Sequence, residues 1–303
     1  MPEDRQPRKP RSGGRPGQST GGRPSGGRND DRRNAGSRAG APGGGRDRGK
    51  SGSKRDFSRP RRDERTDEQR TESQARYDGP PIPEEITGKE LDRSIQGQLK
   101  SLPEKLGQRV ARHLVAAGLL IDSEPKVAYE HTLAARARAS RLAVVREAVG
   151  EAAYAAGEYT EALAELRAAK RMNGAQDYVA IMADCERALG RPDRALALVR
   201  NAPTEKFSPA LLAELTIVEA GARRDRGELD AALRTLETSH LNSKTREPWV
   251  ARLRYAYADA LVEAGRPQDA LTWFHRTEAV DAESITDAAD RAAELEKSLD
   301  AGK

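Results

Sequence analysis

The first residues with an evident chemistry are arginines set among glycines near the start of the chain. Gly-Gly-Arg occurs at residues 13–15, 21–23, 26–28 and 44–46, and further basic clusters follow as far as residue 62. Arginine offers paired donors to phosphate and stacks on bases, while glycine lets a chain follow an irregular backbone. The segment predicts contact with RNA rather than sequence-read duplex DNA, because no recognition helix accompanies it. The arginines concerned are Arg15, Arg23, Arg28, Arg32, Arg33, Arg46, Arg59, Arg61 and Arg62.

A second interpretation of the same segment stays open. Its only aromatic residues are Phe57 and Tyr77, so it lacks the stacking platforms of strong single-strand binders. A tail of this composition also serves simply to keep a protein in solution.

Residues with the chemistry of catalysis or metal binding are few. The histidines His113, His131, His240 and His275 are far apart, and none stands at metal-ligand spacing from the single cysteine, Cys185. We expect surface or half-buried imidazoles and a small thiol packed in a helical core. The Gly43–Gly45 run has no strand before it and no helix after it, so it is not a phosphate-binding loop. The sequence predicts no enzyme, no cofactor and no metal site.

Charge is divided unevenly along the chain. Residues 1–79 hold 21 Lys and Arg against 12 Asp and Glu, hence +9, and the rest holds 32 against 36, hence −4. A basic head on a mildly acidic body indicates a polyanionic partner for the head.

A lone cysteine suits a reducing compartment. The start lacks the apolar core of a secretory signal, and the longest apolar run, at residues 114–121, is too short to span a membrane. We expect a soluble cytoplasmic protein.

Composition also predicts the elements that must position these residues. Residues 1–79 are too poor in apolar side chains to fold and predict a disordered tail. From there on, Ala, Leu, Glu and Arg dominate without strand-like alternation, which predicts helices throughout. The expected parts are a linker with a short helix at 80–102, a degenerate helical pair at 103–140, four repeats at 141–281 and a capping helix at 282–303.

Four glycines at intervals of 33, 37 and 38 residues mark the repeats, which read GEYTEAL, GRPDRAL, GELDAAL and GRPQDAL. A small residue stands seven before and another five after each glycine, and a large apolar residue stands nine after it. Small residues let two helices approach closely, and glycine commonly follows a helix C-terminus. A hairpin of this kind must stack to bury its apolar face. The pattern comprises the turn residues Gly157, Gly190, Gly227 and Gly265 and the packing residues Gly150, Ala183, Ala220, Ala258, Ala162, Ala195, Ala232 and Ala270.

This pattern resembles the tetratricopeptide repeat over about residues 141–280. The body, with PPIPEEIT, VARHLVAAG and AYEHTLAARARASRLAVVREA, also resembles a group of uncharacterised actinobacterial tetratricopeptide-repeat proteins. The resemblance implies an all-α solenoid of helical hairpins whose first helices line a concave groove for a protein partner. The chain departs from the family where a tryptophan is usual, at Arg146, Val179, Thr216 and Arg254, and it lacks the usual closing proline.

The places that the resemblance assigns to the concave side lie 13, 10, 6, 3 and 2 residues before each glycine. Of these twenty places, eight are acidic and three are basic, namely Arg187, Arg224 and Arg252. This local acidic excess predicts a groove for a basic or helical partner segment; a merely solvated face is the alternative. The candidate groove residues are Glu147, Glu151, Tyr154, Asp177, Asp184, Glu214, Asp225, Tyr255, Asp259 and Glu263.

Together these features predict a non-enzymatic scaffold that binds a protein in its groove and RNA or a ribonucleoprotein through its tail. The alternative is a purely protein-binding regulator whose tail only solubilises it. A third hypothesis follows from the opposite charges: tail and groove bind each other, and RNA competes for the tail.

Overall fold

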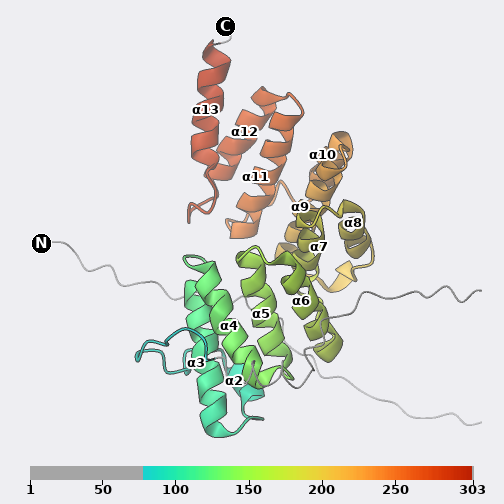
Figure 1. Cartoon of the computed structure of the whole chain (residues 1–303). Helices are drawn as coiled ribbons and strands as arrows, with labels where there is room; N and C mark the ends of the chain where they lie inside the picture. The colour runs from blue at the N-terminus through green and yellow to red at the C-terminus, as the bar shows by residue number, and fades with distance from the viewer. Residues whose placement is uncertain (1–77, 302–303) are drawn as a thin grey trace, which may run out of the picture. The chain divides into compact units, whose positions relative to one another are not determined.

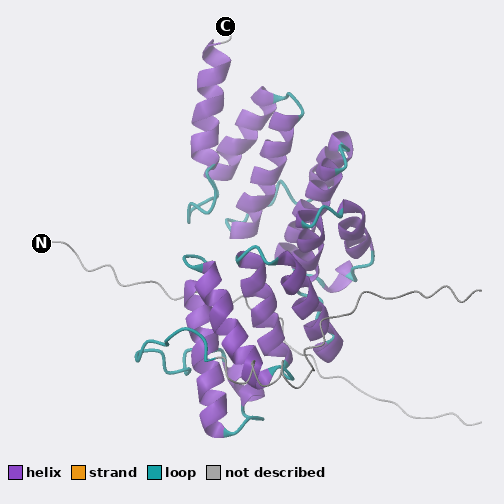
Figure 2. Ribbon diagram, viewed as in Figure 1, coloured by secondary structure: helices purple, strands orange, loops and turns teal. Residues whose placement is uncertain are grey.

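The computed structural model describes residues 78–301, which are helical and contain no strand (Figures 1 and 2). The expectation of an all-α body is confirmed for this part of the chain, and the nine tail arginines lie outside it. The elements are α2 (Arg93–Leu99), α3 (Glu104–Leu120), α4 (Pro125–Ala139), α5 (Ala143–Ala155), α6 (Tyr159–Asn173), α7 (Val179–Ala188), α8 (Pro192–Arg200), the 3₁₀ turn η1 (Thr204–Lys206), α9 (Pro209–Asp225), α10 (Leu229–Glu237), α11 (Pro248–Glu263), α12 (Pro267–Glu278) and α13 (Ala288–Ala301).

From α3 to α12 the helices pack as consecutive pairs: α3 with α4, α5 with α6, α7 with α8, α9 with α10, and α11 with α12 (Figure 1). The first helices of successive pairs also contact one another, from α5 through α7 and α9 to α11. This arrangement gives the described residues a continuous row of first helices. None of the helices in residues 78–301 is long and apolar enough to cross a membrane.

The recurring glycines end the first helix of each pair. Gly157, Gly190, Gly227 and Gly265 have φ of +81°, +70°, +76° and +70°, the left-handed region that favours glycine. In each turn the next residue's N–H donates to a carbonyl five residues back, as from Glu158 to Ala153 at 2.8 Å. This is the Schellman arrangement, which satisfies carbonyls that the helix end would leave without donors. The use of these glycines as helix ends is confirmed.

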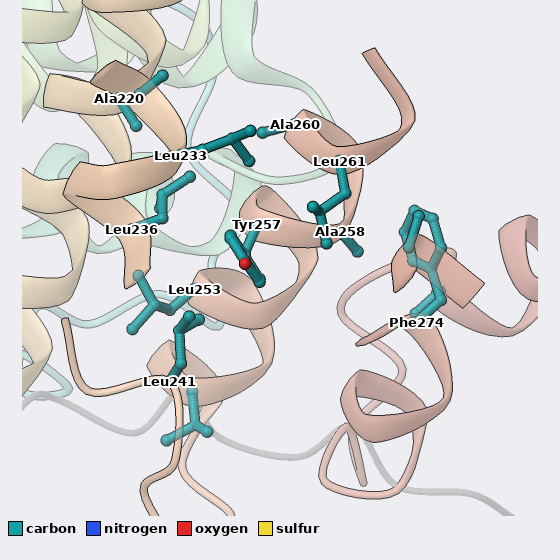
Figure 3. Close-up of a cluster of buried hydrophobic side chains, with 14 of the residues drawn as sticks. Ala220, Leu233, Leu236, Leu241, Leu253, Tyr257, Ala258, Ala260, Leu261 and Phe274 are labelled. Atoms are coloured by element: carbon teal, nitrogen blue, oxygen red, sulfur yellow. The ribbon is translucent and has the colours of Figure 1, made fainter. Parts of the chain in front are cut away.

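The small-and-large pattern packs the two helices of a pair together. A Cβ on Gly150 of α5 would lie 2.5 Å from Leu166 Cδ2 of α6, so only glycine fits there without movement. The alanines five residues after each glycine are fully buried. Figure 3 shows the corresponding cluster around α11, where Leu253, Tyr257 and Leu261 pack with residues of the neighbouring helices.

At residue 254, where the tetratricopeptide pattern usually has a tryptophan, this chain has an arginine that links several backbone segments. Arg254 donates to the carbonyls of Leu241, Ser243 and Arg276 at 2.8–2.9 Å. These carbonyls belong to the connection before α11 and to α12, so one guanidinium ties three stretches of backbone together. Arginine can do this because it carries five N–H donors in a fixed plane.

Two helices begin later than their composition predicts. The short helix expected within residues 80–102 begins only at Arg93, because the Asp92 side chain accepts from Ser94 N at 2.7 Å and caps it there. The capping helix expected at residues 282–303 begins only at Ala288. Before it, Asp281 accepts from the backbone N–H groups of Ile285 and Thr286, both at 2.9 Å, and holds the chain in a turn.

Candidate partner-binding surface

The ten candidate groove residues lie along the row of first helices, and none of them is fully buried. Neighbouring helices of this row are in contact, so side chains of one repeat reach those of the next. Glu147, Glu151 and Tyr154 lie on α5, Asp177 lies just before α7, Asp184 lies on α7, Glu214 and Asp225 lie on α9, and Tyr255, Asp259 and Glu263 lie on α11.

Arg187 connects α7 to α9. Its Nη1 lies 2.6 Å from Asp184 Oδ1, and its Nε lies 2.8 Å from Asp225 Oδ2. The guanidinium rests on Gly221 of α9, where a Cβ would come within 2.7 Å of Arg187 Cζ. Asp184, Arg187 and Asp225 border a hollow of about 520 Å³. The absent side chain at Gly221 thus lets one arginine serve carboxylates of two repeats.

Arg224 repeats the arrangement from α9 to α11. Its Nη1 lies 2.9 Å from Asp259 Oδ2, and its Nε donates to Glu263 Oε2 at 2.6 Å. Arg187 and Arg224 both stand three residues before a repeat glycine. The same position in two successive repeats therefore makes the same kind of bridge.

Two further arginines complete the pattern. Arg252 of α11 lies 2.7 Å from Glu214 of α9. Arg291 of α13 lies 3.1 Å from Asp259 Oδ1 and donates to the Tyr255 hydroxyl at 3.2 Å. We call Arg187, Arg224, Arg252 and Arg291 the arginine ladder.

The arginine ladder pairs with most of the acidic residues that the sequence pattern assigns to the groove. Five of the eight acidic groove residues pair with it. Pairs of this exposure each stabilise a fold by only about 0.2–1 kcal/mol. Their larger effect is to neutralise the surface from α7 to α13 and to hold its side chains in fixed positions.

The remaining three carboxylates gather at the α5 end of the row. Glu147, Glu151 and Asp177 form no ion pair with any lysine or arginine of residues 78–301. Glu147 accepts from Asn173 Nδ2 at 2.6 Å, a neutral donor. Glu151 and Tyr178 hydrogen-bond to each other. We call Glu147, Glu151 and Asp177 the acidic end.

Glu151 shows the electrostatic result most clearly. Burial raises its pKa to about 7, the Glu147 carboxylate adds to the rise, and the hydrogen bond with Tyr178 opposes it. Burial and the neighbouring acidic end, Glu151 first, also raise the pKa of the Tyr178 hydroxyl. A cation placed here would favour the charged carboxylate, because an opposite charge close by lowers the pKa of an acid.

Tyr154 explains why the acidic end lacks an arginine. It stands three residues before Gly157, where the next two repeats carry Arg187 and Arg224. Its hydroxyl donates to Asp184 Oδ2 at 2.5 Å. The first repeat is therefore linked to the second by a neutral donor rather than by an arginine. Burial, and then the bond to Asp184, raises the pKa of Tyr154.

Two histidines are wrongly predicted. His113 and His131 are only 1% and 2% exposed, and their Nδ1 atoms lie 3.0 Å apart. They come from the paired helices α3 and α4, so fold topology joins residues that are distant in sequence.

Burial raises the pKa of the Cys185 thiol to about 12, which keeps it protonated. In residues 78–301 no three His, Cys, Asp or Glu side chains are placed to hold a metal ion.

Arg291 and Tyr178 are the surface residues that the sequence pattern misses. Arg291 lies on α13, which is expected only to cap the repeats, and Tyr178 lies just outside the repeat places. The bridges themselves have a weak sequence signal: partners such as Arg187 and Asp225 are separated by 38 residues, close to one repeat. A scan for opposite charges one repeat apart would find them.

A scan of the sequence against protein-family models found no match, and a search of curated proteins found no match either. What this surface can do is therefore inferred from its own residues.

Proposed function

We propose that this chain is a non-enzymatic scaffold of tetratricopeptide-like repeats that binds a basic segment of a protein partner at its acidic end. The carrying observation is the contrast on one row of helices: five carboxylates are held by arginines, whereas Glu147, Glu151 and Asp177 pair with no arginine of residues 78–301. The glycine turns and paired helices favour the repeat assignment. A scaffold of this kind positions partners rather than transforming a substrate.

A basic peptide suits the acidic end for three reasons. Glu147 and Glu151 lie on α5, and Asp177 lies in the turn just before α7, so the fold determines their positions and little ordering is needed on binding. Tyr154 and Tyr178, both partly exposed, add flat apolar area beside them. Arginine and lysine side chains would supply the cations that the chain itself supplies elsewhere on the row.

The test is the affinity of a fluorescein-labelled Arg-Ala repeat peptide for the full chain, measured by anisotropy. Neutralising the acidic end with Glu147→Gln, Glu151→Gln and Asp177→Asn should weaken binding about tenfold or more. The matched control, Asp230→Asn with Glu283→Gln and Glu294→Gln, removes the same charge from exposed positions elsewhere and should change affinity less than about threefold. Equal losses of affinity in both variants would show that only net charge matters and would reject the site.

We further propose that the basic tail contacts RNA, supported by the +9 charge of residues 1–79. The test is anisotropy of a labelled single strand of about 20 nucleotides, titrated with the full chain at several salt concentrations. Serine at the nine candidate arginines should weaken binding and flatten the salt dependence, and lysine at the same places should retain much of both. If the serine variant binds the RNA as tightly as the wild type does, the tail arginines are not the RNA contacts, and the tail is only a solubilising segment.

A further inference from the structure

A second charged feature lies on α3, the first helix of the first pair, where the segment 78–82 packs against it. The segment and α3 enclose a hollow of about 450 Å³. Its wall includes Lys105, Arg109 and Arg112, spaced four and three residues apart and therefore on one face of the helix. Gln108 and His113 complete the α3 side of the hollow.

The segment is held firmly in this position. Arg112 donates to the carbonyl of Ile82, the last residue of the segment, at 3.5 Å, and just beyond it to the carbonyls of Pro83 at 3.0 Å and Ile86 at 2.6 Å. Gly79 has φ +74°, and a Cβ there would lie 2.5 Å from Ala134 Cβ and 3.1 Å from His113 Cε1. The hollow is therefore a formed feature of the fold rather than a gap between loose chains.

The charges around the hollow are unbalanced. Asp78 is its one acidic wall residue, and its carboxylate pairs with Arg109 at 2.9 Å and with Arg138 of α4. Lys105 forms no ion pair with any carboxylate of the described residues. Among the described residues, three basic wall residues, Lys105, Arg109 and Arg112, thus stand against one carboxylate.

His113, one of the residues that line the hollow, has an unsatisfied polar atom. The residue is 1% exposed, its Nδ1 is engaged by His131, and its Nε2 is buried without a hydrogen-bond partner. Buried polar atoms in folded proteins nearly always have a partner. Burial lowers the pKa of His113 to about 4, with contributions from His131 and from Arg109, Arg138 and Arg112, so the ring is neutral at pH 7. The same arginines make the hollow electropositive.

We propose that this hollow binds a phosphate monoester through Lys105, Arg109, Arg112 and the neutral imidazole of His113, and that Asp78 occupies part of it when no ligand is bound. A carboxylate presents two oxygens in one plane, whereas a terminal phosphate presents three oxygens and about two charges. It can therefore engage donors that Asp78 leaves unused. The site does not depend on the proposed protein or tail contacts.

The test uses the full chain and the ring signals of its histidines in a nuclear magnetic resonance titration at pH 7 and constant ionic strength. The probes are inorganic phosphate, adenosine 5′-monophosphate, and a short RNA with either a 5′-phosphate or a 5′-hydroxyl. Saturable shifts of the buried His113 and His131 signals are expected with a phosphomonoester, while exposed His240 and His275 serve as internal controls. A response to the nucleotide or the phosphorylated RNA, but not to inorganic phosphate, supports the site and identifies the larger ligand.

Variants distinguish a built site from general attraction. Lys105→Gln or Arg109→Gln should weaken binding about tenfold, and the charge-matched control Lys126→Gln on α4 should not. Asp78→Asn should tighten binding, because it removes the competing charge. Three results would overturn the proposal: shifts that never saturate, equal shifts with 5′-hydroxyl RNA, or weaker binding by Asp78→Asn.

Discussion

The acidic end and the carboxylates of the arginine ladder lie along the same row of helices, use the same kinds of carboxylate, and differ in one recurring position. Three residues before the glycine, the first repeat has Tyr154 where the second and third have Arg187 and Arg224. The ladder satisfies its acids from within the chain. A count of acidic residues is therefore a poor guide to a binding surface, and the acids that remain without a cation are the informative ones.

A pH dependence of peptide binding is expected at the acidic end and not at the arginine ladder. The pKa of Glu151 is raised to about 7, so the free protein holds a proton there below that pH. A bound cation would favour the ionised form, so affinity for a basic peptide should rise up to about tenfold between pH about 6 and about 8.

Calorimetry in two buffers of different ionisation enthalpy checks this prediction, because binding near pH 7 should release a proton. Glu151→Gln should remove both the release and the pH dependence. Arg224→Gln at the ladder should keep them. A pH dependence that survives in Glu151→Gln would assign it to another group.

Breaking the ladder should make a second acidic patch. Arg224→Gln leaves Asp259 with Arg291 as its remaining arginine partner and removes the arginine partner of Glu263. We expect weak additional binding of the Arg-Ala peptide and a loss of about 1 kcal/mol in the free energy of unfolding.

Peptide stoichiometry and urea denaturation measure these two effects of Arg224→Gln. Arg234→Gln on α10 is the control, since Arg234 is exposed and forms no ion pair in the described residues. A stable Arg224→Gln protein that binds no more peptide than Arg234→Gln would show that freed acids alone do not recruit a basic segment.

A smaller effect is expected at Gly221, which supports the Arg187 guanidinium. Alanine there gains helix propensity of up to about 1 kcal/mol but must displace the end of Arg187. We expect the two effects to cancel to within about 1 kcal/mol. Gly227→Ala should instead lose about 1–2 kcal/mol, because its φ is +76°. Thermal unfolding of both variants checks this prediction. A larger loss of stability in Gly221→Ala than in Gly227→Ala would contradict this account of the ladder.

The sequence predicts most of the helices because each depends on local signals. Glycine ends a helix wherever the chain needs a positive φ, and the pairing of Gly150 with Leu166 follows from spacing within one repeat. Contacts between repeats are harder to predict. Arg187 meets Asp225 only because α7 and α9 adopt a particular register, which composition does not determine.

The same reason explains the two largest omissions at the candidate sites. His113 and His131 meet across a helical pair that carries no repeat glycine, so no periodic pattern aligns them. Arg291 comes from α13, outside the repeats. The acidic positions are readable from sequence, whereas the distinction between paired and unpaired ones needs the three-dimensional structure.

The most direct test converts the acidic end into another step of the ladder. Tyr154→Arg should place a cation beside Asp184 and the acidic end and lower affinity for the Arg-Ala peptide about tenfold or more. Tyr154→Phe removes the hydroxyl without adding charge and should stay within about threefold of the wild-type affinity. Anisotropy of the labelled peptide with the three full-length proteins gives the answer. Equal affinity for wild type and Tyr154→Arg would contradict the claim that the acidic end binds a basic partner.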